Sequence, residues 1–187
     1  MIKFVIASVS ASGKTTLVNR AIDDYNLTRL LTCTTREIRP EETGDEYHFL
    51  TKENFLSKVN DNQFVEYSKV YENYYGLTKE EVDSNSNSHT IIILDVQGTE
   101  KFKSIYPDTV TIFIDPPPRK ELLRRLNSRN TNDADVSNRI KMVDLELEHR
   151  EKFDHIVKYD KLENMIQQLN DIIDMRIYID RIHSKIF

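Results

Sequence analysis

Short apolar runs alternate with amphipathic segments along most of the chain. Residues 91–94 are continuously apolar, as expected of a strand that helices cover on both faces. Similar runs, rich in β-branched and aromatic residues and bounded by polar ones, predict the other strands. The predicted strands span residues 2–7, 30–34, 47–50, 64–67, 90–95, 110–115 and 155–158.

Apolar positions three and four residues apart predict helices between these strands. The predicted helices span residues 13–25, 52–60, 79–83, 99–105, 119–128, 133–153 and 162 onward. Because strands and helices alternate, we predict an α/β fold with a mainly parallel central sheet. Residues 35–85 differ, with short strands, polar loops and many tyrosines, and they indicate an inserted subdomain.

Composition narrows the choice of partners and compartment. The chain has 187 residues, enough for one domain, and a net charge of −5, so neither nucleic acid nor a membrane surface is an expected partner. Its single cysteine, Cys33, excludes a disulfide framework. We find neither a signal-peptide pattern nor an apolar stretch long enough to span a membrane, and we expect a cytoplasmic protein.

The segment S-V-S-A-S-G-K-T follows the first predicted strand and resembles a phosphate-binding loop, or P-loop. The pattern departs at Ser8, where a glycine is usual, and we expect this serine to adopt the unusual backbone angle at a cost of about 1 kcal/mol. Lys14 would neutralise the β- and γ-phosphates, and the Thr15 hydroxyl would ligate Mg²⁺. The alternative is a loop with a merely solvated lysine. The predicted ATP-binding residues are Ser8, Val9, Ser10, Ala11, Ser12, Gly13, Lys14, Thr15 and Thr16.

Further motifs follow the P-loop in a fixed order. They read T-T-R-x-x-R-P-x-E, Y-H-F, F-x-E, N-Y-Y-G and L-D-V-Q-G. Together with the P-loop, this series resembles the guanylate kinase family from residue 3 to about residue 173.

The resemblance implies a fold, a reaction and a set of ligands. The fold would be a P-loop NTPase-type three-layer α/β fold with a mainly parallel central sheet, an inserted NMP-binding subdomain and a small helical lid. The reaction would transfer a phosphoryl group from ATP, with Mg²⁺, to GMP or dGMP. We expect one domain over residues 1–187, with core segments at about 1–34, 86–124 and 143–187, the insertion at about 35–85 and the lid at about 125–142.

The resemblance also assigns the acceptor site. Two arginines and two tyrosines would clamp the monophosphate, and the planar arginine fork suits a phosphate. Two carboxylates and a hydroxyl would read guanine, because a carboxylate can accept from N1–H and the 2-amino group, both of which adenine lacks on that edge. The implied GMP-binding residues are Thr32, Arg36, Arg39, Tyr47, Glu66, Tyr75 and Asp95.

Each of these assignments has a plainer alternative. The arginines could form surface salt bridges with the acidic residues that follow them, and the glutamate of F-V-E-Y could be a solvated strand residue. The acidic residues in question are Glu37, Glu41 and Glu42.

Three arginines form the predicted lid. Arg125 and Arg129 lie four residues apart on one helical face, where like charges repel unless an anion lies between them. With Arg139 they match family arginines that close on the transferring phosphoryl group, so the predicted catalytic residues are Lys14, Arg125, Arg129 and Arg139. The alternative is a solvated helix in which Glu121 pairs with Arg125.

Three positions depart from the family at the site: Ser8, Leu77 and Ile93. Leu77 stands where the family usually carries a hydroxyl near the base, so we expect Leu77→Ser to strengthen GMP binding by about 0.5–1.5 kcal/mol, the net contribution of one hydrogen bond. Ile93 replaces an acidic residue. These changes leave open a kinase of altered base choice. A non-catalytic module that binds phosphorylated peptides is the other alternative, although such modules typically lose the P-loop lysine and the lid arginines.

The last predicted helix continues past the resemblance. Met165, Ile172, Ile179 and Ile186 repeat every seven residues. This stripe could pack on the chain's own core or form a homodimer through the C-terminal helix.

Overall fold

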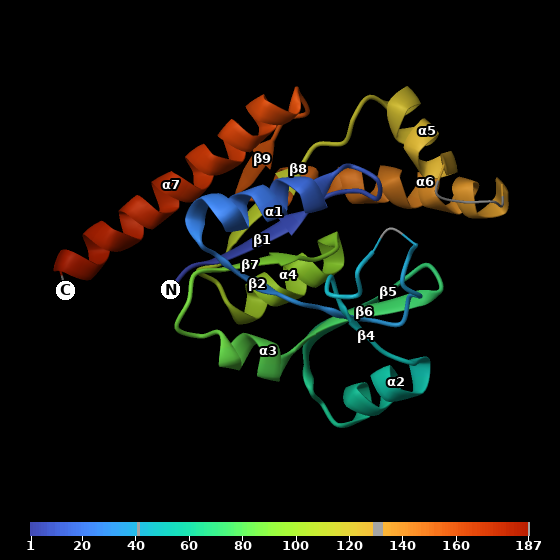
Figure 1. Ribbon diagram of the computed structural model, residues 1–187, viewed down its shortest axis with the longest axis horizontal. Coiled ribbons are helices and arrows are strands. Elements are labelled where there is room, and N and C mark those ends of the chain that lie inside the picture. The colour runs from blue at the N-terminus through green and yellow to red at the C-terminus, as the bar shows by residue number, and fades with distance from the viewer. Residues whose placement is uncertain (41, 129–132, 187) are drawn as a thin grey trace.

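Five strands form a wholly parallel central sheet in the computed structural model, which describes residues 1–40, 42–128 and 133–186 (Figure 1). Their order across the sheet is β2-β7-β1-β8-β9. The prediction of an α/β fold with a mainly parallel sheet is therefore confirmed. The strands are β1 (Lys3–Ala7), β2 (Thr28–Leu30), β7 (Thr90–Ile93), β8 (Val110–Ile114) and β9 (His155–Val157).

Helices cover both faces of this sheet, as the apolar runs require. On one face, α1 (Lys14–Tyr25) and α7 (Leu162–Ile186) pack on alternate residues of β1, Phe4 and Ile6. On the other face, Val5 packs with Phe102 of α4 (Val96–Ile105). The result is three layers, and Figure 1 shows α1 and α7 together on one side of the sheet.

A second, four-stranded sheet has the order β4-β3-β6-β5. The predicted strand 30–34 is wrong, because the chain leaves the central sheet after β2 and enters the second sheet as β3. The sequence also failed to predict β6, whose tyrosines and glycine lack an apolar run. The elements of this region are β3 (Cys33–Thr34), β4 (His48–Phe49), α2 (Lys52–Asn60), β5 (Phe64–Val70), β6 (Asn73–Thr78) and α3 (Lys79–Ser84).

The remaining helices lie at the carboxyl edge of the central sheet (Figure 1). They are α5 (Arg119–Ser128) and α6 (Asp133–Glu148), and the 3₁₀ turn η1 (Arg150–Lys152) leads into β9. The predicted helix 133–153 thus ends five residues early. Within the part of the chain that the structure describes, no helix is long and apolar enough to cross a membrane.

Two departures from the family lie in hydrophobic surroundings. Leu77 is fully buried and belongs to the cluster that joins Val5 and Phe102, so its side chain packs in the core. Ile93 is partly buried against the core cluster under α1 and α7. Leu77→Ser would place a hydroxyl in this core, and the gain in GMP binding expected from the sequence stays a prediction.

The buried stripe of α7 differs from the predicted one. Met165, Leu169, Ile173 and Ile177 are buried against the central sheet, with a spacing of four residues. The seven-residue stripe therefore does not describe how this helix packs, because an α-helix of 3.6 residues per turn keeps the i and i+4 positions on one face.

We predict that Leu77→Ser destabilises the fold by about 2–5 kcal/mol, since it removes buried methyl groups and buries a hydroxyl. The free energy of unfolding in urea measures this. Leu162→Ser is the matched control, because Leu162 is 45% exposed, and it should change stability little. Equal effects of the two substitutions would contradict the placement of Leu77.

Candidate functional site

The loop between β1 and α1 has the geometry of an anion cradle. Ala11 and Gly13 have positive φ angles, 64° and 95°, which turn successive backbone N–H groups toward one side. The expectation for Ser8 is wrong, because its φ is not positive; the Ser8 hydroxyl instead donates a 2.6 Å hydrogen bond to the Ile114 carbonyl of β8. The serine thus fixes the loop to the sheet, and Ala11 adopts the left-handed angle.

Lys14 begins α1 and folds back over this loop. Its Nζ donates to the carbonyls of Ser8 and Val9, at 3.4 and 3.3 Å. Ser12 is buried, and its hydroxyl has no hydrogen-bond partner among the residues that the structure describes. Thr15 is exposed in the first turn of α1. A loop with a buried unpaired hydroxyl, an ammonium group and a helix N-terminus is suited to phosphate.

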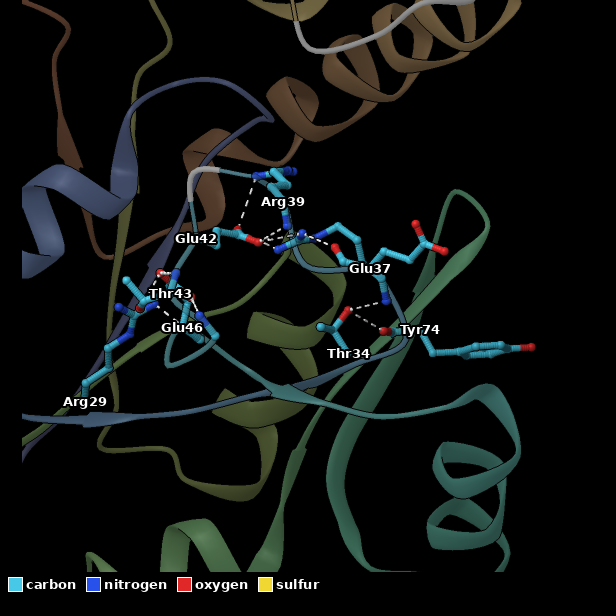
Figure 2. Close-up of polar contacts among 10 residues, drawn as sticks. Arg29, Thr34, Glu37, Arg39, Glu42, Thr43, Glu46 and Tyr74 are labelled. Carbon is cyan, nitrogen blue, oxygen red and sulfur yellow. Dashed lines mark hydrogen bonds and ion pairs between the residues drawn. The ribbon is translucent and has the colours of Figure 1, made fainter.

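The two arginines that follow β3 meet at one carboxylate. Arg36 donates to both oxygens of Glu42, at 2.9 and 2.8 Å, and the Arg39 backbone N–H donates to the same group at 2.9 Å. Figure 2 shows Glu42 pointing toward Arg39. Burial opposes the charges of this pair, but these hydrogen bonds outweigh it, lowering the pKa of Glu42 and raising that of Arg36. The salt-bridge alternative thus holds for Glu42, whereas Glu41 lies outside the described residues.

Aromatic rings, those of Tyr47 and Phe49, lie against the Arg36 guanidinium. The guanidinium carbon of Arg36 lies 5.3 Å from the ring centre of Tyr47, and the Tyr47 and Tyr75 rings meet edge to face at 6.1 Å. Burial and the neighbouring Tyr75 raise the pKa of Tyr47, so its hydroxyl remains a donor at neutral pH. Thr32 is buried just ahead of β3. The structure therefore brings Arg36, Arg39, Tyr47 and Tyr75 together.

The two predicted base-reading carboxylates are neighbours. Glu66 of β5 is 5% exposed. Both carboxylates lie against Gly98: the position that a Cβ on this glycine would take is 2.7 Å from Oε2 of Glu66 and 3.6 Å from Oδ1 of Asp95. Asp95 precedes α4 and accepts the Gly98 N–H at 2.8 Å. Burial, together with the Asp95 charge, raises the pKa of Glu66 to about 8. The alternative of a solvated Glu66 is excluded.

Sequence reasoning missed a third carboxylate at this place. Glu146 of α6 lies near Lys14 and Asp95, and burial raises its pKa to about 7, although Lys14 acts in the opposite direction. It lines a cavity of about 110 Å³ between β5, the start of α4 and α6, together with Ser68, Asp95 and Met142. No motif surrounds Glu146, so only the fold reveals it.

One of the predicted lid arginines reaches the P-loop. Nη1 of Arg125 lies 4.0 Å from the position that a Cβ on Gly13 would take, while its Nε donates to Glu121 at 2.8 Å. Arg125 therefore pairs with Glu121 and lies beside the P-loop at the same time. Arg129 lies outside the described residues, as does the side chain of Arg139.

Comparisons with known proteins agree on one family. The family model described as guanylate kinase matches residues 1–176. A curated guanylate kinase of Acinetobacter baylyi is 37% identical over 175 residues, which cover 91% of this chain and 84% of the relative. A second, from Clostridium acetobutylicum, is 34% identical over 189 residues, with 97% and 90% covered.

Solved structures show the same fold. The crystal structure of guanylate kinase from Anaplasma phagocytophilum matches with a TM-score of 0.73 and 24% identity, over 93% of this chain and 85% of that one. Shikimate kinase from Bacteroides thetaiotaomicron matches with a TM-score of 0.54 and 13% identity, over 92% and 98%.

We predict that Glu66→Gln makes the protein more stable than the parent above about pH 5. Between about pH 4.5 and 8 the unfolded chain has lost the Glu66 proton while the folded chain keeps it, so parent stability falls as pH rises. The difference between parent and variant should widen by at most about 1.4 kcal/mol per pH unit. Urea unfolding at several pH values measures it, with the exposed Glu53→Gln as control. A constant difference across this range would contradict a neutral Glu66.

Proposed function

The chain belongs to the guanylate kinase family and transfers a phosphoryl group from ATP to GMP, and we propose that the residues of this site perform the transfer. The main support for assigning these residues to the active site is that two of the carboxylates line one cavity beside the P-loop lysine. Asp95 and Glu146 both line this cavity, and Glu146 neighbours the P-loop lysine. A phosphate-binding loop and a carboxylate pocket thus adjoin, as a donor nucleotide and an acceptor nucleotide require.

The P-loop holds the phosphates of ATP in this proposal. Backbone N–H groups around Ala11 and Gly13 and the unpaired Ser12 hydroxyl donate to phosphate oxygens, while Lys14 exchanges its loop carbonyls for them. Arg125, already beside Gly13, approaches the transferring group from α5. Arg129 and Arg139 are proposed to join it from the lid, over about residues 125–142.

Mg²⁺ fits the same loop. The Thr15 hydroxyl is exposed in the first turn of α1, next to the lysine, and is the side chain that would hold the ion. When bound, Mg²⁺ would neutralise charge on the phosphates of ATP. The residues of the chain supply positioning and electrostatic stabilisation, and no protein nucleophile is needed because the acceptor phosphate is ionised near neutral pH.

The second sheet and its loops, over about residues 35–85, hold GMP or dGMP. Arg36 and Arg39, with the Tyr47 and Tyr75 hydroxyls, bind the 5′-phosphate. Thr32, Glu66 and Asp95 read the base. Glu66 is neutral in the free protein and must ionise to accept guanine N1–H, so GMP binding releases a proton near neutral pH.

The comparisons favour neither a kinase of altered base choice nor a non-catalytic module that binds phosphorylated peptides. The relatives are guanylate kinases by name, and a phosphopeptide-binding module has no use for a P-loop lysine with an arginine of α5 beside it. Because its substrates are nucleotides of the cytoplasm, we propose a cytoplasmic location.

We predict that GMP and dGMP are the preferred acceptors in a coupled assay of ADP release with GMP, dGMP, AMP, CMP, UMP and dTMP.

We also predict that Lys14→Met folds normally and loses at least about 10³-fold in transfer rate, because one donor to a transferring group contributes roughly 3–4 kcal/mol. Lys52→Met, on the exposed start of α2, is the matched control. A Lys14→Met rate within tenfold of the parent would overturn the P-loop assignment.

We also propose that two copies associate through α7. Met175, Tyr178 and Ile182 are 59%, 66% and 38% exposed and follow a three- and four-residue spacing. In an antiparallel pair that crosses near Tyr178, Asp174 of one copy would approach Arg181 of the other, twice by symmetry. The exposed stripe extends past residue 176, where the family match ends.

We predict that the parent is a dimer by light scattering and that Tyr178→Lys makes it a monomer that still phosphorylates GMP. Leu162→Lys changes another exposed apolar residue of α7 and should leave the dimer intact. Truncation after residue 173 is a poorer test, because it removes Ile177 from the core. A monomeric parent would overturn this proposal and leave the kinase assignment unaffected.

A further inference from the structure

A serine that no motif includes lies in the base-reading part of the site. Ser68 is two residues after Glu66 on β5, and both side chains are buried. Because strand residues two apart share a face, the two side chains point the same way. The Ser68 hydroxyl donates a hydrogen bond to Oδ2 of Asp95.

Asp95 is thereby held from two sides. Its Oδ1 accepts the Gly98 N–H at 2.8 Å, and its Oδ2 accepts from Ser68. Each carboxylate oxygen can accept more than one hydrogen bond, so both keep capacity for a ligand. Ser68 and Asp95 both line the cavity of about 110 Å³. The serine therefore orients a carboxylate whose remaining lone pairs are available at a cavity.

The neighbouring strand β6 offers no side-chain hydroxyl beside Glu66. Leu77 of β6 pairs in register with Glu66 and stands where the family usually has a hydroxyl near the base. Since the Leu77 side chain is apolar and packs in the core, it offers the base no hydroxyl. A hydroxyl on the paired strand β5, two residues from Glu66, lies at the same carboxylate pair.

We propose that Ser68 is a positioning residue for guanine recognition, which holds the Asp95 carboxylate so that it accepts a hydrogen from the 2-amino group of guanine. This inference rests on the proposed function. Glu66 takes N1–H and one amino hydrogen, and Asp95 takes the other amino hydrogen.

The test compares GMP with inosine monophosphate, which has N1–H but lacks the 2-amino group. Dissociation constants from isothermal titration should rise about tenfold for GMP in Ser68→Ala, the scale expected for a hydrogen bond to a charged group. The constant for inosine monophosphate should change by less than about twofold, as should the KM for ATP. A merely structural role would weaken both monophosphates equally.

Matched variants complete the design. Ser104→Ala makes the same change at an exposed serine of α4 and should alter neither constant. Ser68→Thr keeps the hydroxyl, and the adjacent cavity has room for its methyl group. This variant should therefore keep the parent's ratio of the dissociation constants for GMP and inosine monophosphate. If Ser68→Ala does not fold, Ser68→Cys keeps the size with a much weaker donor and should show the same loss.

An unchanged ratio of the two dissociation constants in the folded Ser68 variants would overturn this inference while the kinase assignment stands. Absence of GMP phosphorylation by the parent would instead overturn the proposed function, and the inference with it.

Discussion

The candidate site depends on the parallel pairing of β1 with β7. Ile6 and Ile93 are partners in this ladder, so the two strands end side by side, and the segments after them emerge at the same edge. After β1 comes the P-loop, and after β7 comes Asp95 at the start of α4. A parallel sheet places the carboxyl ends of its strands together, and this alone brings residues that are about ninety positions apart to one place. The helices α5 and α6 then add Arg125 and Glu146 to it.

The candidate site also depends on electrostatics. Because the chain has a net charge of −5, any site for an anion must be created locally. The carboxyl groups around Asp95 do not all remain charged: burial raises the pKa of Glu66 to about 8 and that of Glu146 to about 7, and Asp95 contributes to both shifts. Protonation thus limits the negative charge that gathers around Asp95 when no ligand is bound. A guanine that donates to these groups supplies the compensation that ionised carboxylates need in a buried place. In the proposed site, guanine binding and the ionisation of Glu66 are therefore coupled.

Sequence reasoning was strong where a local pattern dictates structure and weak where distant segments meet. Buried apolar runs predicted the strands of the central sheet other than β2, and the P-loop motif placed Lys14. The strand β6 was missed, since its partner and not its own residues makes it a strand. Leu77 was assigned to the base because of its place in a motif, whereas core packing turns it away. Ser68 and Glu146 stand in no motif and acquire meaning only through Asp95, which lies on another element.

The arginine clamp shows why two interpretations that look opposed are compatible. Glu42 holds Arg36 through two hydrogen bonds and also accepts the Arg39 backbone N–H, and the Arg36 guanidinium lies over the Tyr47 ring. A salt bridge of this kind fixes a long side chain before any ligand arrives, so less conformational entropy is lost when a phosphate binds. The two arginines carry two positive charges and Glu42 removes only one. The group therefore keeps a net positive charge, and in the proposed acceptor site the salt bridge would support the arginines that bind the phosphate.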